Sequence, residues 1–325
     1  MTGLRSEAEA YFRDLRDRIC ARLEELDSAR FVRRAWKREG GGGGEMSELR
    51  GEVFEKAGCN FSAVWGDKYP SAVDPSSSTA TGASPDAAPT PSPPPRTLHE
   101  ASDIRSDTAK PGSAATDKSA QIASDLDARL GIRPPTPAEV AGKPFFATGV
   151  SLVLHPRNPF VPVVHMNVRY LEAGEGTWFG GGMDLTPCKP FEEDTRHFHR
   201  VLQKVCNAHG PDLYDRFSRW AKDYFFIKHR GSERGVGGIF FDYLRGDERW
   251  SFLRDVGDAF LPAYAPLAER RRALPYTEEE RAQLLRWRGR YVEFNLIYDR
   301  GTLFGLRTGG NVEAIFMSLP PLVAW

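Results

Sequence analysis

The residues best suited to chemistry lie in the stretch HMNVRYLEAGEGTWFGGGMDLTPCKP, residues 165–190. Its first half alternates polar and apolar side chains, as a β-strand with two different faces does. His165, Asn167 and Arg169 share one face of that strand and together offer groups for proton transfer and hydrogen bonding. Asp184 follows three glycines and can accept N–H hydrogen bonds or cap the next turn. Alternation alone leaves two interpretations open, a solvent-facing polar row and the wall of a reaction site.

A second segment repeats this pattern. In YVEFNLIYD, residues 291–299, Glu293 and Asn295 alternate with apolar residues, which predicts a second strand that adds polar groups to a cavity floor. The triple glycine Gly180–Gly182 removes side chains where a backbone or ligand must come close. It does not fit a dinucleotide-binding motif, because no helix with the required spacing follows and Pro187 interrupts the stretch. The two segments together favour a polar floor with an opened space beside it.

The seven histidines raise the question of a metal centre. His197 and His199 lie two residues apart in a predicted helix, so they face different directions and cannot easily share one ion. The stronger candidates for a shared site are His155, His165, His199 and His229, which only the fold can bring together. Spacing alone therefore leaves a metal site open.

Four arginines lie next to glycines at expected element ends: Arg230, Arg234, Arg300 and Arg307. A partly buried arginine needs a carboxylate or phosphate to replace its lost hydration. A solvated surface position explains such residues equally well, because 44 basic residues balance 44 acidic ones. Because the net charge is close to zero, the protein as a whole does not attract nucleic acid or an acidic membrane surface electrostatically. We expect no nucleic-acid partner.

Bulk properties indicate a globular protein of a reducing compartment. The 325-residue chain is 40% hydrophobic, which is enough for a sizeable core. Its four cysteines form no CxxC pair and are too sparse for a disulfide framework. No apolar run approaches the roughly 20 residues that span a bilayer, and the N-terminus lacks the hydrophobic core of a signal peptide. We expect a cytoplasmic protein with no membrane span. The alternative that an N-terminal targeting sequence has been removed stays open.

Composition divides the chain into three parts. Apolar positions keep a helical period from Leu4 to Leu26, and the glycine run Gly40–Gly44 follows, as a flexible linker or as part of an ordered arm. Of the 50 residues from 71 to 120, 34 are Ser, Pro, Ala or Thr, so this segment cannot bury enough to offset its ordering entropy. We predict an N-terminal helix and glycine-rich arm over 1–70, a disordered Ser/Pro/Ala-rich insertion over 71–128, and the main body of the same single domain over 129–325.

From Pro144 onward, strand-like and helix-like segments predict an α+β fold. Several strands alternate cleanly, as antiparallel strands covered by helices do, so we expect a large, mainly antiparallel sheet flanked by helices on both sides. The expected strands are 149–155, 161–172, 177–184, 237–244, 290–299, 301–308 and 312–319. The expected helices lie near 192–208, 212–229, 249–271 and 277–287, and the last begins with Thr277 and Glu280 at capping-box spacing.

Several motifs together resemble one enzyme family. They are GVSLVLHPRNP, HMNVRY, WFGGGMDLTP, HGPDLY, DYFFIKHRGSERGVGGIFFD, GRYVEFNLIYDRGTLFGL and MSLPP. In this order they resemble the oxygen-dependent coproporphyrinogen III oxidases of haem biosynthesis, and WKREGGGGGEMSELRGEVFEKAGCNFSAVWG is similar to the glycine-rich arm of that family. The resemblance implies that two propionates of coproporphyrinogen III are oxidatively decarboxylated to vinyl groups, with O2 as electron acceptor. It also implies that no redox cofactor is needed beyond O2.

The resemblance implies roles for particular residues. Asp184 would accept hydrogen bonds from pyrrole N–H groups, Arg169 would hold a substrate carboxylate, and His165 would be the proton donor. The matching substrate-contact positions are Ser151, Asn167, Val168, Arg169, Gly309, Gly310 and Asn311. In bacterial-type relatives a divalent metal would be held at the positions of His155, His165, His199 and His229. The stretch from Tyr291 to the C-terminus matches the dimerisation region, which implies a homodimer.

The chain also departs from the family pattern at two positions. Tyr243 follows Asp242 where the family often has a second aspartate, and Asn311 stands where a relative often has arginine. Three functions stay open on the sequence: the cofactor-free oxidase, a metal-dependent oxygenase that uses the histidines, and a non-catalytic tetrapyrrole carrier. For the oxidase, an Asp184→Ala variant is expected to lose turnover and keep its fold.

Overall fold

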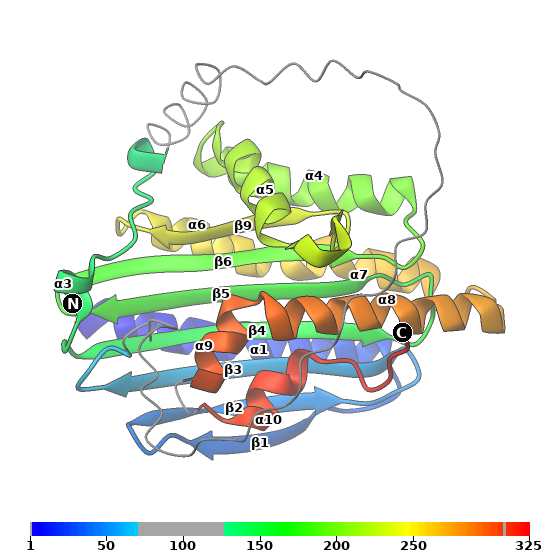
Figure 1. Ribbon diagram of the computed structural model, residues 1–325, viewed down its shortest axis with the longest axis horizontal. Coiled ribbons are helices and arrows are strands. Elements are labelled where there is room, and N and C mark those ends of the chain that lie inside the picture. Colours follow the sequence, from blue (N-terminus) through cyan, green and yellow to red (C-terminus); the bar gives the residue numbers. More distant parts are fainter. Residues whose placement is uncertain (1, 71–126, 308–309) are drawn as a thin grey trace, which may run out of the picture.

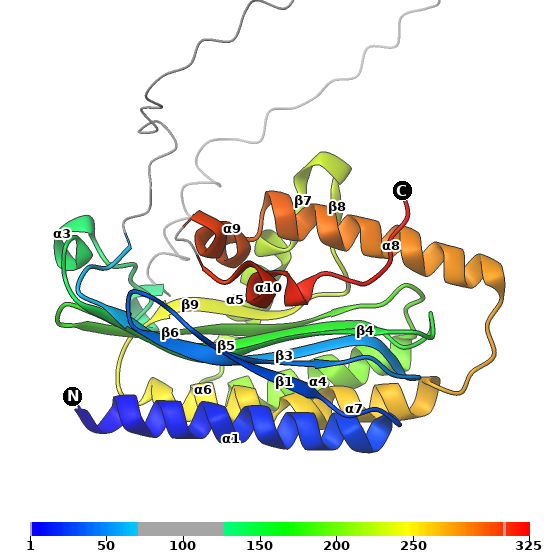
Figure 2. The same ribbon diagram turned by 90° about the horizontal axis from the view of Figure 1, so that it is seen from below.

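The structure is a computed structural model that describes residues 2–70, 127–307 and 310–325. The predicted insertion at 71–128 lies outside the described residues except for its last two positions, and Gly309 lies outside them as well. The described chain forms one large antiparallel sheet with helices on both of its faces (Figures 1 and 2). The predicted α+β fold class is therefore confirmed.

The large sheet has seven strands, and every neighbouring pair is antiparallel. In chain order they are β1 (Val32–Lys37), β2 (Gly42–Leu49), β3 (Phe54–Gly66), β4 (Phe145–Pro156), β5 (Val163–Ala173), β6 (Gly176–Thr186) and β9 (Gly238–Leu244). They lie side by side in this same order, so the arm before the insertion and the body after it build one sheet. A separate short hairpin consists of β7 (Phe226–Ile227) and β8 (Ser232–Glu233).

The helices divide between the two faces of the sheet. One face carries α1 (Thr2–Leu26), α4 (Glu192–His209), α6 (Arg249–Asp258) and α7 (Phe260–Arg271), as Figure 2 shows. The opposite face carries α8 (Glu278–Ile297), α9 (Arg300–Arg307) and α10 (Val312–Ile315). The remaining helical segments are α3 (Pro137–Val140), α5 (Leu213–Tyr224), which packs against β9, and the turns η1 (Lys228–Arg230) and η2 (Phe316–Ser318).

The alternation of β4, β5 and β6 sorts their side chains by face, as the sequence predicts. Most apolar residues point to the α1 side and pack into the main core, while the α8 side carries small and polar residues together with Val153 and Val163, which pack on Tyr291. Because one side of each strand is sealed by apolar packing, the register is fixed and the polar row cannot turn inward. The core members from these strands include Val150, Leu152, Leu154, Met166, Val168, Tyr170, Phe179, Met183 and Leu185.

Three predicted strands are wrong. The segments 290–299, 301–308 and 312–319 belong instead to α8, α9 and α10–η2. The buried residues of α8 follow helical spacing, and they include the polar Arg288 and Asn295, which masks the helical period in the hydrophobic pattern. The predicted helices 212–229 and 277–287 end at Tyr224 and Ile297 respectively, and 249–271 is two helices.

The glycine run is an ordered part of the sheet. Gly42 to Gly44 begin β2, and a Cβ on Gly44 would lie 2.8 Å from the Trp36 ring of the neighbouring strand β1. Glycine is needed there because the Trp36 ring occupies the space that a side chain would fill. The flexible-linker interpretation is therefore wrong.

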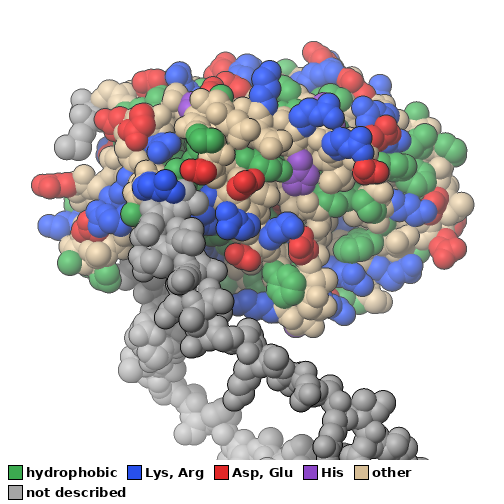
Figure 3. Space-filling model, turned by 90° about the horizontal axis from the view of Figure 1, so that it is seen from above, with side chains coloured by type: hydrophobic (Ala, Val, Ile, Leu, Met, Phe, Trp, Pro, Cys, Tyr) green, Lys and Arg blue, Asp and Glu red, His purple; other side chains and the backbone are tan. Residues whose placement is uncertain are grey.

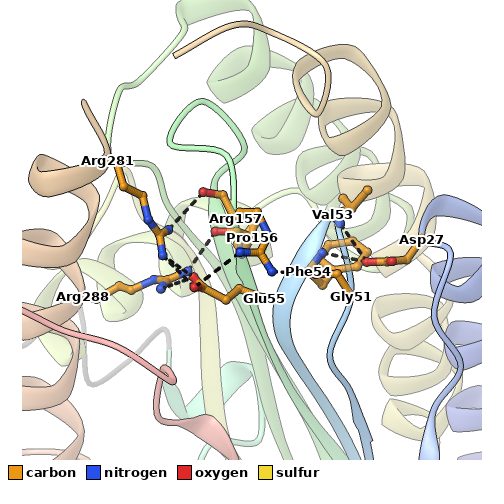
Figure 4. Close-up of polar contacts among 9 residues, drawn as sticks. All are labelled: Asp27, Gly51, Val53, Phe54, Glu55, Pro156, Arg157, Arg281 and Arg288. Carbon is orange, nitrogen blue, oxygen red and sulfur yellow. Dashed lines mark hydrogen bonds and ion pairs between the residues drawn. The ribbon is translucent and has the colours of Figure 1, made fainter. Parts of the chain in front are cut away.

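Two carboxylates join the N-terminal arm to the rest of the fold (Figure 4). Asp27, at the end of α1, accepts backbone N–H groups of Val53 and Phe54 at 2.9 and 2.8 Å and so holds the turn between β2 and β3. Gly51 lies so close to this carboxylate that a Cβ would overlap it. The second carboxylate, Glu55 of β3, binds arginines of α8 and so ties the arm to the helices of the opposite face.

The surface agrees with the balanced charge of the sequence. In Figure 3, acidic and basic side chains are mixed over the side that lies at the top of Figure 1. Across the residues that the structure describes, no helix combines the length and apolarity needed to cross a membrane.

Candidate active site

The polar row of β5 lies on the sheet face that α8 covers. His165, Asn167 and Arg169 are half-buried there, whereas Val168 between them is fully buried on the other side. Pairing with β6 places His165 opposite Asp184 and Arg169 opposite Gly180. The structure thus puts on one sheet face the three side chains that the sequence predicts as catalytic, and it brings two of them, His165 and Asp184, into contact.

Asp184 is a buried carboxylate at the centre of this face. His165 Nδ1 lies 2.8 Å from its Oδ1, and Arg234 Nη2 donates to both of its oxygens at 2.6 Å. Burial alone would raise the pKa of Asp184, but the Arg234 charge and the hydrogen bonds from His165 and Arg234 outweigh burial and lower that pKa. The carboxylate is therefore ionised at neutral pH.

This ionised carboxylate determines which nitrogen of His165 carries a proton. An ionised carboxylate only accepts hydrogen bonds, so Nδ1 must be the donor in this contact. Nε2 has no hydrogen-bond partner within the described ranges, so it is the nitrogen left to exchange a proton. The contact therefore fixes the ring orientation of His165 and leaves Nε2 without a partner among the described residues.

Arg234 is the third member of the buried cluster around Asp184. The sequence identified it as an arginine that needs an anion but did not predict which one. Its side chain is 3% exposed, and its guanidinium lies over the rings of Phe225, Tyr291 and Phe294 at 4.1, 4.7 and 4.6 Å. Among the described residues, Asp184 is the carboxylate in ion-pair contact with Arg234, and the rings supply no further anion. Because Tyr291 and Phe294 belong to α8, the buried ion pair also joins that helix to β6.

Arg169 reaches across the glycines of β6 to a second carboxylate. Its Nη2 lies 2.9 Å from Asp242 Oδ2 on β9, and its Nη1 donates to Asn167 Oδ1 at 2.6 Å. A Cβ on Gly180 would lie 2.6 Å from Asp242 Oδ1 and 2.7 Å from Arg169 Nε. Gly180 is therefore required as a passage for the guanidinium, a role that the sequence did not reveal because Asp242 lies far along the chain.

The other predicted substrate-contact residues differ in where their side chains lie relative to this face. Ser151 of β4 is half-buried and paired opposite Asn167, and Gly310 and Asn311 precede α10. The Asn311 side chain accepts from the Ala314 N–H at 3.1 Å and caps that helix. Alternation turns the Val168 side chain into the core, so any contact of this residue with substrate would be made by its backbone, and its place in the site stays a prediction.

The four histidines predicted as metal ligands are not assembled into one site. Each histidine instead makes its own hydrogen bonds. His155 Nε2 contacts the Ser318 carbonyl, and His165 contacts the Asp184 carboxylate. His199 contacts the Tyr214 hydroxyl and the Val236 carbonyl, and His229 contacts the Tyr298 hydroxyl and the Glu293 carboxylate. In the described part of the chain, no group of three His, Cys, Asp or Glu side chains could hold an ion. The donors present therefore do not fit a divalent metal, because strand and helix positions separate them.

His155 has a structural role that its burial explains. The side chain is fully buried, and burial, assisted by the Arg288 charge, lowers the pKa of His155 to about 3. A neutral imidazole can donate from Nε2 to the Ser318 carbonyl at 2.8 Å. Lys56 Nζ donates to the neighbouring Leu319 carbonyl at 2.8 Å. These two side chains hold the C-terminal segment against the sheet.

Comparison with known proteins agrees with the motifs. A sequence model of the family described as "Coproporphyrinogen III oxidase" matches residues 7–90 and 101–325. The chain is also 41% identical over 351 aligned positions to the "Oxygen-dependent coproporphyrinogen-III oxidase" of Synechococcus sp. (strain CC9605). That alignment covers 99% of this chain and 80% of the relative. Both matches include the strands that carry His165, Asp184 and Arg169.

Proposed function

This chain belongs to the coproporphyrinogen III oxidase family, and we propose that the face around His165, Asp184 and Arg169 is where its substrate reacts. The protein is an oxygen-dependent coproporphyrinogen III oxidase, an oxidoreductase of haem biosynthesis. The observation that carries the placement is the buried Asp184 carboxylate, which binds His165 and lies on the same sheet face as Arg169. It supports the proposal because the candidate acid–base pair and the candidate carboxylate-binding cation share one face.

The reaction converts two propionates of coproporphyrinogen III to vinyl groups and yields protoporphyrinogen IX. For each propionate, the carbon–carboxylate bond breaks to release CO2, and a hydrogen leaves the carbon adjacent to the ring. The two electrons pass to O2, which takes up two protons and leaves as hydrogen peroxide. The protein's contribution is to position the substrate and to stabilise the charges that develop.

His165 and Asp184 supply the proton chemistry in this proposal. His165 Nε2 is the group that exchanges a proton with the substrate, and Asp184 stabilises the imidazolium from the Nδ1 side. Asp184 Oδ2 accepts only from Arg234 among the described residues, so it retains a lone pair for a pyrrole N–H. A pyrrole bound there would be drawn toward the His165 ring.

Arg169 is the proposed anchor for a substrate carboxylate. Asn167 and Asp242 occupy Nη1 and Nη2 and fix the plane of the guanidinium. Its remaining N–H groups have no partner among the residues that the structure describes, so they can donate to a propionate. Asp242 thereby acts as a positioning residue for Arg169.

Gly180→Ala is expected to raise the KM for coproporphyrinogen III about tenfold or more, because the new methyl group would displace the Arg169 guanidinium from Asp242. Steady-state kinetics with substrate prepared anaerobically would measure the effect. Gly3→Ala is the matched control, since no atom lies within 4 Å of its added Cβ. An unchanged KM in Gly180→Ala would show that the Arg169–Asp242 pair does not position the substrate.

The test of the placement is a single-turnover assay of the full chain. Anaerobically prepared coproporphyrinogen III is mixed with the protein, O2 is admitted, and protoporphyrin fluorescence is measured after oxidation. We expect protoporphyrin from the wild-type protein and none from His165→Ala. Full activity in His165→Ala would remove this residue from the chemistry. Activity that is lost on chelation and restored by a divalent metal would support a metal-dependent route instead.

We also propose a cytoplasmic homodimer that forms through the part of the chain from Tyr291 onward. Seven of the eleven exposed large hydrophobic side chains among the described residues lie in this part, which is a common property of protein interfaces. They are Leu296, Ile297, Phe304, Leu306, Val312, Leu322 and Trp325. Sedimentation of the wild-type protein should give twice the chain mass, and a monomer at micromolar concentration would contradict the proposal.

A further inference from the structure

Strand β9 contains a β-bulge beside the proposed site. Asp242 and Tyr243 lie opposite Gly180 alone, because the register between β6 and β9 shifts by one position there. Tyr243 has a φ of 55°, in the left-handed region that a tyrosine rarely adopts, so its surroundings must hold it there. The Tyr243 N–H donates to Asp242 Oδ1 at 2.9 Å, and its carbonyl accepts the Arg133 N–H at 3.1 Å. These two hydrogen bonds stabilise the bulge.

The bulge turns two consecutive side chains to the same face of the sheet. Asp242 points to the site face, where it pairs with Arg169, and in a regular strand the next side chain would point to the opposite face. The Tyr243 side chain instead packs against the cluster of Ala173 and Trp178. Ala173 lies four positions after Arg169 on β5, so alternation puts this cluster on the site face as well. The bulge therefore adds the Tyr243 ring to the site face, next to Asp242.

The Tyr243 hydroxyl is an unused hydrogen-bonding group close to the Arg169–Asp242 pair. It has no hydrogen-bond partner among the residues that the structure describes. Burial and the Asp242 charge raise the pKa of Tyr243, while Arg300 and Arg169 act to lower it. The phenol therefore lies within electrostatic range of the Arg169–Asp242 pair and stays protonated at neutral pH. A protonated phenol without a partner can donate one hydrogen bond.

We propose that the Tyr243 hydroxyl donates a hydrogen bond to the substrate carboxylate that Arg169 holds, an inference that rests on the function proposed above. Asp242 already offsets the Arg169 charge, so the pair attracts a propionate less strongly than a lone guanidinium would. A neutral O–H donor adds a charge-assisted hydrogen bond to the propionate without adding another anion. An ionised aspartate, which the family often has at this position, can only accept hydrogen bonds. The contact is therefore specific to chains with a hydroxyl donor here.

Binding of coproporphyrin III, the stable oxidised form of the substrate, tests this proposal through quenching of porphyrin fluorescence. Tyr243→Phe removes the hydroxyl and keeps the ring, and it is expected to raise Kd about tenfold. In turnover, kcat/KM should fall by a similar factor. The free energy of unfolding should stay at the wild-type value, because the hydroxyl has no partner within the described fold.

A double variant tests whether Tyr243 and Arg169 bind the same carboxylate. In an Arg169→Gln background, Tyr243→Phe should raise Kd by less than about threefold, because the carboxylate is no longer held beside the phenol. The tetramethyl ester of coproporphyrin III carries no carboxylate and should bind wild type and Tyr243→Phe within about twofold of each other. A tenfold effect of Tyr243→Phe that persists without Arg169 would show that the phenol binds another group, against the proposal.

Tyr276→Phe is the matched control. Tyr276 precedes α8, is 39% exposed, and has a hydroxyl that likewise lacks a hydrogen-bond partner in the described part of the chain. Its substitution should leave Kd unchanged. Wild-type affinity for coproporphyrin III in Tyr243→Phe, or an equal loss of affinity for the ester, would overturn the proposal. Binding without turnover in the wild-type protein would instead contradict the proposed function and leave the Tyr243 contact intact.

Discussion

Asp184→Ala is expected to abolish turnover and to lower the free energy of unfolding by about 3–5 kcal/mol. The variant removes the carboxylate that holds His165 and leaves the Arg234 guanidinium buried with no anion. An unpaired buried charge is far more costly than a missing surface contact, because neither water nor another anion compensates for it. Urea unfolding and the protoporphyrin assay would measure the two effects on the same protein.

A double variant separates stability from chemistry. Asp184→Ala combined with Arg234→Met removes both charges and fills the ring-lined space around Arg234 with an apolar side chain. We expect most of the lost stability to return, because replacing a buried ion pair by apolar groups is often neutral. Turnover should stay absent, since His165 still lacks its carboxylate. Recovery of turnover would show that Asp184 acts only by holding Arg234 in the fold.

This result would also correct an expectation from the sequence. The resemblance to the oxidase family leads to the expectation that Asp184→Ala loses turnover and keeps its fold. The partner that changes this expectation is Arg234, 50 positions along the chain. Its glycine-rich surroundings suggested an arginine in need of an anion, but only the packed fold shows which anion is available.

The face of β5 was predictable because strand alternation is a local property. His165, Asn167 and Arg169 share a face whatever the strand packs against, so their common orientation follows from the sequence alone. The segment 290–299 was not predictable in the same way. This segment lies in helix α8, which buries Arg288 and Asn295 and exposes Leu296. The positions of its hydrophobic residues therefore do not show which side of the helix is buried.

Ion pairs between strands that are not neighbours in the sheet could not be predicted from the sequence either. Asp242 neutralises Arg169 across Gly180, and neither the alternation of β5 nor that of β9 specifies this pairing. Register between non-neighbouring strands depends on the whole sheet, which forms only when β6 lies between them. The function could be recognised from the motifs, whereas the internal organisation of the site required the fold.

Glu55→Gln is expected to cost about 3–5 kcal/mol of unfolding free energy, although Glu55 lies on β3, away from the reacting groups. Its carboxylate accepts from Arg281 at 2.6 and 2.8 Å and from Arg288 at 2.6 Å (Figure 4). Arg288 is 1% exposed, so the neutral amide would leave a buried cation with carbonyl oxygens as acceptors but, among the described residues, no carboxylate to offset its charge. Because α8 carries the rings around Arg234, turnover should fall together with stability.

The dependence on pH distinguishes this ion pair from a simple packing effect. Burial raises the pKa of Glu55, but hydrogen bonds from Arg281 and Arg288 outweigh it and lower the pKa in the folded protein. A lowered folded-state pKa means that the stabilisation is complete above the unfolded value of about 4.3 and is lost as the pH falls through the folded value. The difference in unfolding free energy between wild type and Glu55→Gln should therefore be constant near neutral pH and shrink below about pH 4.

Glu192→Gln, which removes an exposed pair with Arg196, is the control and should change stability by less than about 1 kcal/mol. A Glu55→Gln effect of that same size, or one that does not shrink in acid, would show that the Glu55 charge does not hold α8 to the sheet.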